Sequence, residues 1–265
     1  MFISSLSKNI PHFILGPAYG IYEKKLIGEI KEEKVPHHIG LIMDGNRRYA
    51  ASKGIPTYLG HEMGMKKAEE LLEWANEIGI KIVTLYAFST ENFKRDSEEV
   101  NYIMSMLERK FKEASTNKKI IENKVRVKAI GNIAMLPENV KQAIKEGESA
   151  TERHDNMTLN ICVAYGGRME IIEAIKRILD SCNGGAIDPE EIDTKLLSEN
   201  LFTKGLPDPD IVIRTGGEVR LSNFLLFQSA YAELFFLNVY FPLIRKIDFL
   251  RIIRDFQRRN RRFGR

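Results

Sequence analysis

The chain has 265 residues, of which 43% are hydrophobic and 29% are charged, a balance that fits one large α/β domain with a sizeable core. Its net charge of +4 permits anionic partners but does not indicate a nucleic-acid-binding protein. The two cysteines, Cys162 and Cys182, have no metal-ligand spacing and are too few for a disulfide framework, so we expect a reducing, cytoplasmic setting.

Residues 1–34 are expected to form an N-terminal, partly amphipathic arm outside a main domain of residues 35–265. The stretch "PHFILGPAYGIY" is broken by prolines and glycines, so the arm lacks the apolar core of a signal peptide. The mixture of charged and apolar residues in "YGIYEKKLIGEIKEE" favours peripheral contact with a membrane or with a partner. The longest apolar stretch, at 224–244, is interrupted by Gln228, Glu233 and Asn238, which favours buried strands over a membrane span.

The first expected strand, "HIGLIM" at 38–43, runs into "DGNRR", which begins at Asp44. Gly45 would let the backbone approach a ligand closely, and the helix expected next offers unpaired N–H groups and a positive dipole end. Asp44 would meet a phosphate only through a cation such as Mg²⁺, because like charges repel. A phosphate site and an ordinary turn with solvated arginines both remain open on spacing alone.

A histidine and a polar stretch follow. His61 precedes the helix expected over 64–79 and fits a capping or packing residue as well as a ligand contact. The strand expected over 80–88 ends in "STENFKR", whose Ser, Thr and Asn residues are typical helix caps, so capping and binding roles are both open. The candidates from this stretch are Ser89, Glu91, Asn92, Phe93 and Arg95.

The helix expected over residues 96–115 has apolar residues at three- and four-residue spacing, which is typical of a helix that covers a core. The members of this stripe are Val100, Ile103, Met104, Leu107 and Phe111, and Ala87 lies at the end of the preceding strand. Alternation of strands and helices then continues through 125–131, 137–153, 157–166 and 169–182.

The strand expected over 210–216 carries Arg214 and leads into "TGGEVRLS". Arg220 and Ser222 are two residues apart, so on an extended segment their side chains point the same way. Two arginines and a hydroxyl directed at one point would form a strong diphosphate cradle, because charge-assisted hydrogen bonds are the stronger kind.

The last expected strand, 233–239, begins with Glu233 in an apolar context, where a carboxylate needs a metal ion or an arginine. A buried structural salt bridge is the alternative for it. The C-terminal "RIIRDFQRRNRRFGR" is a basic amphipathic helix pattern, typical of a solvated face. It would suit RNA or anionic lipid, but no RNP-like, zinc-finger or helix-turn-helix pattern supports nucleic-acid binding.

The alternation of strands and helices predicts an α/β fold: a single domain with a central, mostly parallel six-stranded sheet covered by helices on both faces. Sites in such sheets lie beyond the carboxyl ends of the strands. The stretches "DGNRR", "FSTENFKR" and "RTGGEVR" are all expected there.

Four stretches in order, "HIGLIMDGNRRYA", "LYAFSTENFKR", "YGGR" and "IVIRTGGEVRLSNFLLFQSAYAEL", resemble the cis-prenyltransferase family of undecaprenyl and dehydrodolichyl diphosphate synthases. The likeness runs from about residue 36 to the C-terminus. It implies a Mg²⁺-dependent transferase that adds isopentenyl diphosphate repeatedly to an allylic prenyl diphosphate, makes a Z double bond each time and releases diphosphate. It also implies that 35–265 is the catalytic domain, that an apolar tunnel holds the product, and that the enzyme is a homodimer.

The resemblance also implies roles for single residues. Asp44 matches the family's essential metal-linked aspartate, Glu233 matches the second magnesium carboxylate, and Asn92 is the other residue expected to be catalytic. The loop that holds the allylic diphosphate is matched by Gly45, Asn46 and Arg48, with His61 beside it. The second motif, associated with substrate positioning, is matched by Ser89, Asn92, Phe93 and Arg95, and the isopentenyl diphosphate cradle by Arg214, Arg220 and Ser222.

The chain departs from bacterial members, which usually have Gly at the position of Arg47 and Trp at those of Tyr49 and Phe227, and it looks closer to archaeal or eukaryotic members. A family arginine four residues before the histidine is Thr57 here, and Arg47 is the candidate to replace that substrate contact. Part of the apolar stripe over 100–111 would line the tunnel. An Arg-x-Gly pattern at Arg262 and Gly264 would let the C-terminal segment complete the site of a dimer partner.

The main alternative is a non-catalytic partner subunit of a heteromeric cis-prenyltransferase. Such a subunit is expected to lack the metal aspartate and other site residues, whereas Asp44, Asn46, Arg48, Asn92 and Glu233 are all present. A trans-type synthase would need Asp-Asp-x-x-Asp motifs in an all-helical pattern, and a P-loop hydrolase would need its glycine-rich lysine motif. Neither motif occurs, and the sequence does not specify the primer or the product length.

Overall fold

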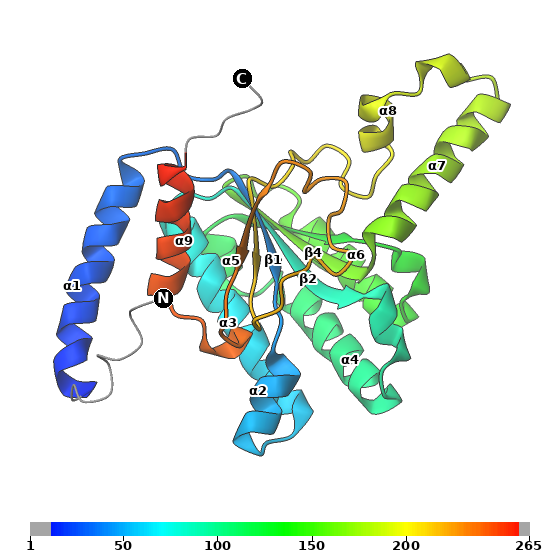
Figure 1. Ribbon diagram of the computed structural model, residues 1–265. Helices are drawn as coiled ribbons and strands as arrows, with labels where there is room; N and C mark the ends of the chain where they lie inside the picture. The colour runs from blue at the N-terminus through cyan, green and yellow to red at the C-terminus, as the bar shows by residue number, and fades with distance from the viewer. Residues whose placement is uncertain (1–11, 260–265) are drawn as a thin grey trace. The chain divides into compact units, whose positions relative to one another are not determined.

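The computed structural model of the protein describes residues 12–259 (Figure 1). The Arg-x-Gly pattern predicted at Arg262 and Gly264 lies outside these residues. Within them the chain forms two compact units, one of residues 36–244 and one that combines residues up to Val35 with residues from Arg245 onward. None of the described helices is both long and apolar enough to cross a membrane.

The larger unit is built on a six-stranded sheet in the order β3-β4-β2-β1-β5-β6, and every pairing in it is parallel. The predicted α/β class is therefore confirmed, with a sheet that is fully rather than mostly parallel. The strands are β1 (His38–Ile42), β2 (Ile82–Ser89), β3 (Val125–Ile130), β4 (Met157–Tyr165), β5 (Ile211–Arg214) and β6 (Glu233–Phe236).

Helices pack around this sheet, as Figure 1 shows. Every residue of β1 and β5 is buried, so both faces at the centre of the sheet are covered, as a parallel sheet requires. The helices of this unit are α2 (Asn46–Lys53), α3 (Thr57–Glu77), α4 (Ser97–Glu113), α5 (Lys118–Glu122), α6 (Glu138–Thr151), α7 (Gly167–Asn183) and α8 (Thr194–Glu199). Helix α3 begins earlier than the apolar pattern indicated and includes His61.

The core of the sheet unit joins residues that are far apart in the sequence. One buried cluster combines Ile42 of β1 and Val212 of β5 with Phe224 and Leu225 from the segment after β5, together with Tyr165 at the end of β4. This packing brings the segment that follows β5 close to the carboxyl ends of β1 and β4. The core thus positions the chemically distinctive loops.

The second unit is a pair of helices, α1 (His12–Lys31) and α9 (Lys246–Arg258), which contact each other. Lys246 Nζ lies 2.7 Å from Glu23 Oε1, Arg254 Nη1 donates to the hydroxyl of Tyr22 at 3.3 Å, and Gln257 Nε2 donates to the carbonyl of Ile30 at 2.9 Å. The described part of the amphipathic arm predicted over 1–34 thus forms a helix that contacts α9, although the two helices are more than 200 positions apart in the sequence.

Candidate active site

The strand order reverses between β1 and β5, because the chain continues from β1 toward β2 and from β5 toward β6. Ligands of open parallel sheets bind at such a point. Asp44 follows β1 and Arg214 ends β5, and their side chains meet there, with Arg214 Nη2 2.8 Å from Asp44 Oδ2. The hydroxyl of Thr215 also donates to the carbonyl of Asp44 at 2.7 Å, which fixes the backbone of the Asp44 turn.

A network of charged and hydroxyl groups extends from this pair. The side chain of Arg214 is only 5% exposed, and its Nη1 donates to Ser222 Oγ at 2.6 Å and to the carbonyl of Arg220 at 2.5 Å. Arg48 joins Asp44 Oδ1 at 3.1 Å to Glu218 at 3.4 Å, and Glu218 also pairs with Arg220 at 2.7 Å. We call these six residues the Arg214 cluster: Asp44, Arg48, Arg214, Glu218, Arg220 and Ser222.

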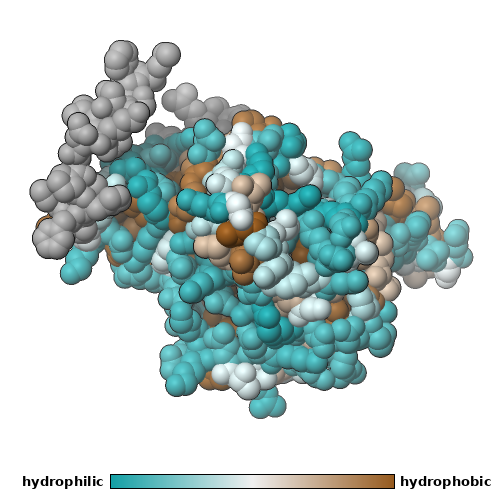
Figure 2. Space-filling view, turned by 90° about the horizontal axis from the view of Figure 1, so that it is seen from below, coloured by the Kyte–Doolittle hydropathy of each residue, from teal (hydrophilic) through white to brown (hydrophobic). Residues whose placement is uncertain are grey.

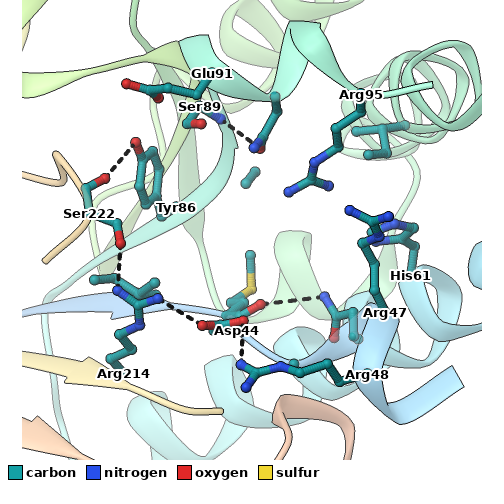
Figure 3. A pocket seen from close by; sticks show the side chains of 18 of the residues that line it. Asp44, Arg47, Arg48, His61, Tyr86, Ser89, Glu91, Arg95, Arg214 and Ser222 are labelled. Carbon is teal, nitrogen blue, oxygen red and sulfur yellow. Dashed lines mark hydrogen bonds and ion pairs between the residues drawn. The ribbon is translucent and has the colours of Figure 1, made fainter. Parts of the chain in front are cut away.

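The Asp44 carboxyl is held in its ionised form. Burial favours the neutral acid, but hydrogen bonds and charge interactions with Arg214 and Arg48 outweigh it and lower the pKa of Asp44 below its ordinary value. Figure 3 shows Asp44 between the two guanidinium groups at the edge of the pocket. The position can therefore offer a negative charge to a metal ion or to a further cation.

The loop from Gly45 to Arg48 is held by close backbone packing. Gly45 has φ +109°, and a Cβ there would lie 2.9 Å from the ring of Tyr240. Gly60 and Gly64 of α3 let Asn46 approach, because a Cβ on either would lie within 2.5 Å of an Asn46 oxygen. We did not single out these two glycines from the sequence, although their four-residue spacing on one helix face was the available signal.

A second charged group lies on the opposite side of the pocket in Figure 3, where Arg47, His61 and Arg95 are drawn. These three side chains converge on one carboxylate, that of Glu99 in the first turn of α4, which is only 10% exposed. Glu99 accepts from Arg95 Nη1 at 2.9 Å and contacts His61 Nε2 at 3.1 Å and Arg47 Nε at 3.5 Å. We call these four residues the Glu99 cluster: Arg47, His61, Arg95 and Glu99.

His61 is favoured in its neutral form. Burial is the main cause of its lowered pKa, and Glu99 opposes that effect only in part. The imidazole therefore serves as a polar neighbour rather than as a fixed cation. His61 is buried, as expected for a packing residue, and it also lines the pocket, so the predicted ligand contact stays a prediction.

The second motif folds as a strand end followed by the 3-10 helix η1 (Thr90–Lys94). The side chain of Asn92 accepts a hydrogen bond from the backbone N–H of Ser89 at 3.0 Å, which is the predicted capping arrangement. Glu91 accepts from Asn223 Nδ2 at 3.0 Å. Phe93 packs edge-to-face on buried Phe88, with ring centroids 4.8 Å apart, and is not part of the pocket lining within the described residues.

A cavity of about 1030 Å³ lies between the two clusters. Apart from Phe93 and Glu233, all the sequence-predicted site residues line it. Two buried polar atoms at its wall, Asn46 Oδ1 and Arg214 Nε, have no hydrogen-bond partner within residues 12–259, as is typical where a ligand binds. Figure 2, seen from below, shows hydrophobic residues at the centre of one face among hydrophilic ones.

One part of the cavity is apolar, and part of the predicted stripe of the helix α4 lines it, as expected. Ile103 and Leu107 line it as expected, together with Met106, Met65 of α3 and Ala87 of β2. The other expected members, Val100, Met104 and Phe111, are not part of the lining. Phe111 instead lies against Gly147 of α6. The apolar stripe of α4 is wide, so one side of it faces the cavity and the other side packs on α6.

Glu233 does not join Asp44. It is the first residue of β6 and pairs in register with Ile211, whereas Arg214, at the other end of β5, pairs with Phe236. Because the strands are parallel, Glu233 lies at their amino ends, whereas Asp44 follows the carboxyl end of β1. Within the described residues there is also no cluster of three or more Asp, Glu, His or Cys side chains that would enclose a metal ion.

Several functional neighbours were not singled out from the sequence. Glu99 and Glu218 supply the carboxylates that the arginines contact, and Tyr86 and Asn223 also line the cavity. Glu99 and Glu218 lie in charged stretches that are typical of solvated surface. Arg95 and Arg220 are near neighbours of Glu99 and Glu218 in the sequence, but Arg47 and Arg48 are distant, and only the folded chain identifies these two partners. The cavity as a whole has two arginine-rich regions that can bind anionic groups. Beside them is an apolar space that can hold a hydrocarbon chain.

The comparisons with known proteins agree with this chemistry. Residues 42–264 match the prenyltransferase family model of undecaprenyl diphosphate synthases. The chain is 52% identical over 263 residues to a tritrans,polycis-undecaprenyl-diphosphate synthase (geranylgeranyl-diphosphate specific) of Pyrococcus abyssi, covering 99% of this chain and 100% of that one. It is 50% identical over 246 residues to a protein of the same name from Methanocaldococcus jannaschii, covering 92% and 88% of the two chains.

A solved structure is similar as well. The crystal structure of lavandulyl diphosphate synthase from Lavandula x intermedia, in complex with dimethylallyl diphosphate, matches with a TM-score of 0.82 at 33% identity. The match covers 89% of this chain and all of that one. The sequence matches and the structural match therefore both lead to prenyl diphosphate synthases.

Proposed function

Because the chain belongs to the undecaprenyl diphosphate synthase family of prenyltransferases, we propose that it adds isopentenyl diphosphate units repeatedly to an allylic diphosphate primer. Each step would make a Z double bond and release diphosphate. The observation that carries the proposal is the single cavity with two cationic clusters beside an apolar end. The names of the archaeal relatives support geranylgeranyl diphosphate as the primer and a tritrans,polycis-undecaprenyl diphosphate as the product.

In this proposal three members of the Arg214 cluster, Arg214, Arg220 and Ser222, bind isopentenyl diphosphate. Arg220 and Ser222 line the cavity beside Arg214, as expected for the diphosphate cradle. The buried Arg214 orients Ser222 through a 2.6 Å hydrogen bond, and Arg220 is exposed enough to turn from Glu218 to an entering diphosphate. A charge-assisted contact from the buried Arg214 would contribute about 1.5–3 kcal/mol, and the exposed Arg220 would contribute less because solvent screens it.

The allylic diphosphate would lie between the Asp44 loop and the Glu99 cluster. Gly45, Asn46 and Arg48 provide the loop, and Arg47, His61 and Arg95 provide the opposite side. Thr57 lines the same cavity, so the arginine that it replaces in the family pattern has no counterpart at that position. The guanidinium of Arg47 supports the proposal that this chain supplies the missing charge from a different residue.

The chemistry depends on charge. Breaking the allylic carbon–oxygen bond places negative charge on the leaving diphosphate, and fixed cations around it lower the barrier because they are oriented before the reaction begins. Arg48 and Arg95 are held by carboxylates in the described structure and need little reorganisation. We assign Asn92 to positioning at the reacting centre, since its amide is already oriented by the Ser89 backbone.

Mg²⁺ fits the donor set around Asp44. This ion favours few carboxylates together with water and substrate phosphates, and the ionised Asp44 carboxylate at the cavity edge is a ligand of that kind. When bound, Mg²⁺ would neutralise charge that develops on the departing diphosphate. Glu233 lies elsewhere in the same chain, so our proposal for the ion rests on Asp44 and on the diphosphates.

The growing hydrocarbon chain would enter the apolar end of the cavity. Its lining here is Met65, Ala87, Ile103, Met106 and Leu107. Burying apolar chain surface is favourable by about 25 cal/mol per Å², so each added isoprene unit is drawn toward this end. The family's product tunnel is thus proposed between β2 and the helices α3 and α4.

The alternative of a non-catalytic partner subunit is not supported. The residues expected to be lost in such a subunit are present, and those that line the cavity are held by hydrogen bonds and ion pairs. Relatives that are half identical over nearly the whole chain are named as synthases. We therefore propose a catalytic chain.

We propose a homodimer in which α7 supplies a contact face. Ile172, Ile175 and Leu179 are exposed and lie on one side of that helix, and contiguous exposed apolar residues are typical of interaction surfaces. Light scattering of the full chain should give twice the monomer mass, and Ile175→Glu should reduce it. A monomeric mass for the unsubstituted chain would contradict the proposal.

We propose that the enzyme is cytoplasmic and that residues 1–34 contact the membrane peripherally. Both cysteines, Cys162 and Cys182, are unpaired, as expected in a reducing compartment. Co-sedimentation with liposomes should be weaker for a chain without residues 1–34. Equal binding by the two chains would exclude a membrane role for the arm.

The proposed function is tested by incubating the protein with labelled isopentenyl diphosphate, Mg²⁺ and primers of several lengths, including dimethylallyl and geranylgeranyl diphosphate. Chromatography should show preferred use of geranylgeranyl diphosphate and a product of undecaprenyl length. Absence of incorporation with every primer would overturn the proposal. Incorporation that continues in excess chelator would overturn the metal dependence alone.

A further inference from the structure

The stretch "YGGR", residues 165–168, has no role in the site described above. It nevertheless contacts Asn223, the neighbour of Ser222 in the proposed isopentenyl diphosphate cradle. Asn223 accepts two hydrogen bonds from the beginning of α7: its carbonyl from the N–H of Gly167 at 2.8 Å and its side-chain Oδ1 from the N–H of Arg168 at 2.9 Å. The first N–H groups of a helix have no partner within that helix. Asn223 therefore caps α7 from 55 positions away in the sequence.

The other end of the same amide contacts the second motif. Asn223 Nδ2 donates to Glu91 Oε1 at 3.0 Å. Burial would favour neutral Glu91, but hydrogen bonds from its own N–H, from Ser89, from Asn223 and from Thr90 lower its pKa. One side chain thus connects the first turn of α7 to an ionised carboxylate that lines the cavity.

The glycines of "YGGR" allow this approach. A Cβ on Gly166 would lie 2.7 Å from Asn223 Nδ2 and 2.9 Å from Thr90 Oγ1. A Cβ on Gly167 would lie 2.9 Å from the side chain of Leu226. Since real Cβ atoms do not come this close, a side chain at Gly166 would displace the Asn223 amide, and one at Gly167 would push against Leu226.

The backbone at this point is unusual. Ser222 and Asn223 are consecutive non-glycine residues with positive φ, +50° and +68°. Such conformations persist only where surrounding contacts fix them, and Asn adopts them more readily than Ser. The turn directs Ser222 Oγ to Arg214 and its carbonyl to the hydroxyl of Tyr86, at 2.6 and 3.3 Å. Figure 3 shows Ser222 between these two partners.

We propose that Asn223 is a positioning residue that holds Ser222 and Glu91 in their places on the cavity wall by joining both to the N-terminus of α7. The inference rests on the proposed function, because it assigns Asn223 to the isopentenyl diphosphate subsite. It acts through its two neighbours rather than on the reacting atoms. Its loss should therefore weaken binding of isopentenyl diphosphate and leave the KM of the allylic primer little changed.

Three variants separate the amide from the backbone. Asn223→Asp keeps the acceptor for α7 but places a carboxylate against Glu91. Asn223→Gly keeps the positive φ and removes the amide altogether. In the double variant Asn223→Asp with Glu91→Gln, the new amide can donate to the new carboxylate, so the contact is restored with its direction reversed.

The measurements are the dissociation constant of isopentenyl diphosphate alone by calorimetry, in which no turnover occurs, and the KM of each substrate. Asn223→Asp should raise the dissociation constant and KM of isopentenyl diphosphate about tenfold or more, and Asn223→Gly should raise them less. The double variant should recover toward Glu91→Gln alone. Asn139→Asp is the matched control, since Asn139 makes the same kind of bond to Glu108 on the outer surface at 2.5 Å and should change neither value.

The outcomes are distinct. Unchanged isopentenyl diphosphate binding in Asn223→Asp would overturn the positioning role, as would a failure of the double variant to recover while its melting temperature is normal. Binding that follows the expected pattern in a protein that elongates no primer would overturn the proposed function and support the positioning role. Absence of isopentenyl diphosphate binding by the unsubstituted chain would overturn both.

Discussion

The two charged clusters of the cavity are built in different ways. The Arg214 cluster lies at the ends of β1 and β5 and is organised around a guanidinium that is 5% exposed and bonded to Asp44, Ser222 and the backbone. The Glu99 cluster draws on the helices α2, α3 and α4 and on Arg95 just before α4, and it is organised around a carboxylate. Its cations reach inward from the surface, and the side chain of Arg47 is 59% exposed. One cluster has a buried cation, and the other has a buried anion.

This difference suggests different tasks. A buried arginine whose two Nη atoms are bonded to Asp44, Ser222 and the backbone has one preferred geometry, because moving it would leave an unpaired charge in an apolar surrounding. Long arginine side chains held by a shared carboxylate can exchange that partner for a phosphate at a small cost. In the proposed cycle isopentenyl diphosphate always enters with the same size, whereas the allylic substrate lengthens with every turn. A rigid cradle suits the first and an adaptable one suits the second.

The largest effect should come from Asp44, the carboxylate that joins Arg214 to Arg48 in the Arg214 cluster. Asp44→Asn retains the shape of the side chain but removes its charge, so turnover should fall about 100-fold or more, because stabilisation of developing charge is lost. Incorporation of labelled isopentenyl diphosphate measures the effect, and circular dichroism checks that the fold is unchanged. Near-normal product formation by Asp44→Asn would contradict the metal role.

The adaptable cluster should respond to loss of its shared carboxylate. Glu99→Gln removes the charge that holds the cations of this cluster, and we expect the KM of the allylic primer to rise about tenfold while that of isopentenyl diphosphate changes little. Steady-state kinetics with each substrate varied in turn measures the split. Glu62→Gln is the control, because Glu62 also pairs with an arginine, Arg109, but that arginine is not part of the cavity lining, whereas Arg47 and Arg95 are. Equal changes in both KM values would remove the distinction between the clusters.

A more modest effect is expected from single exposed arginines, one in each cluster. Arg220→Ala should weaken isopentenyl diphosphate use and Arg47→Ala should weaken allylic diphosphate use, each by up to about tenfold, because exposed cations are partly screened by solvent. Apparent affinities for the two substrates, measured at one ionic strength, compare the variants. If the two substitutions affected the same substrate, the assignment of the clusters would be wrong.

The smallest effect concerns pH and stability. The pKa of His61 is lowered mainly by burial, so the native state resists its protonation, whereas the unfolded chain takes up this proton below about pH 6.5. The contribution of His61 therefore reduces stability as pH falls through that value. An NMR titration should place the His61 pKa below its ordinary value, and lower still in Glu99→Gln. A raised pKa in the native protein would show that Glu99, and not burial, controls this histidine.

Local chemistry in the sequence was enough to predict most of the polar residues that line the cavity. The carboxyl ends of parallel strands meet at one edge, so Asp44 after β1, Ser89 in the last position of β2 and Arg214 at the end of β5 could be expected to converge before any coordinates were known. Glu233 shows the limit of that reasoning. An apolar run with one acid indicates that the acid needs a partner, but the strand register decides at which edge of the sheet it lies.

The sequence by itself determined the α/β class, the family and the residues that bear charge at strand ends, because these depend on periodicity and on short ordered motifs. Only the tertiary structure decided which carboxylates hold the arginines, which side of α4 faces the cavity, and why "YGGR" needs its glycines. Some of these pairs are neighbours on one helix turn, such as Arg95 and Glu99, but others join distant positions, such as His61 with Glu99 and Asp44 with Arg214. Their geometry is fixed by packing of the whole sheet, which no local pattern encodes.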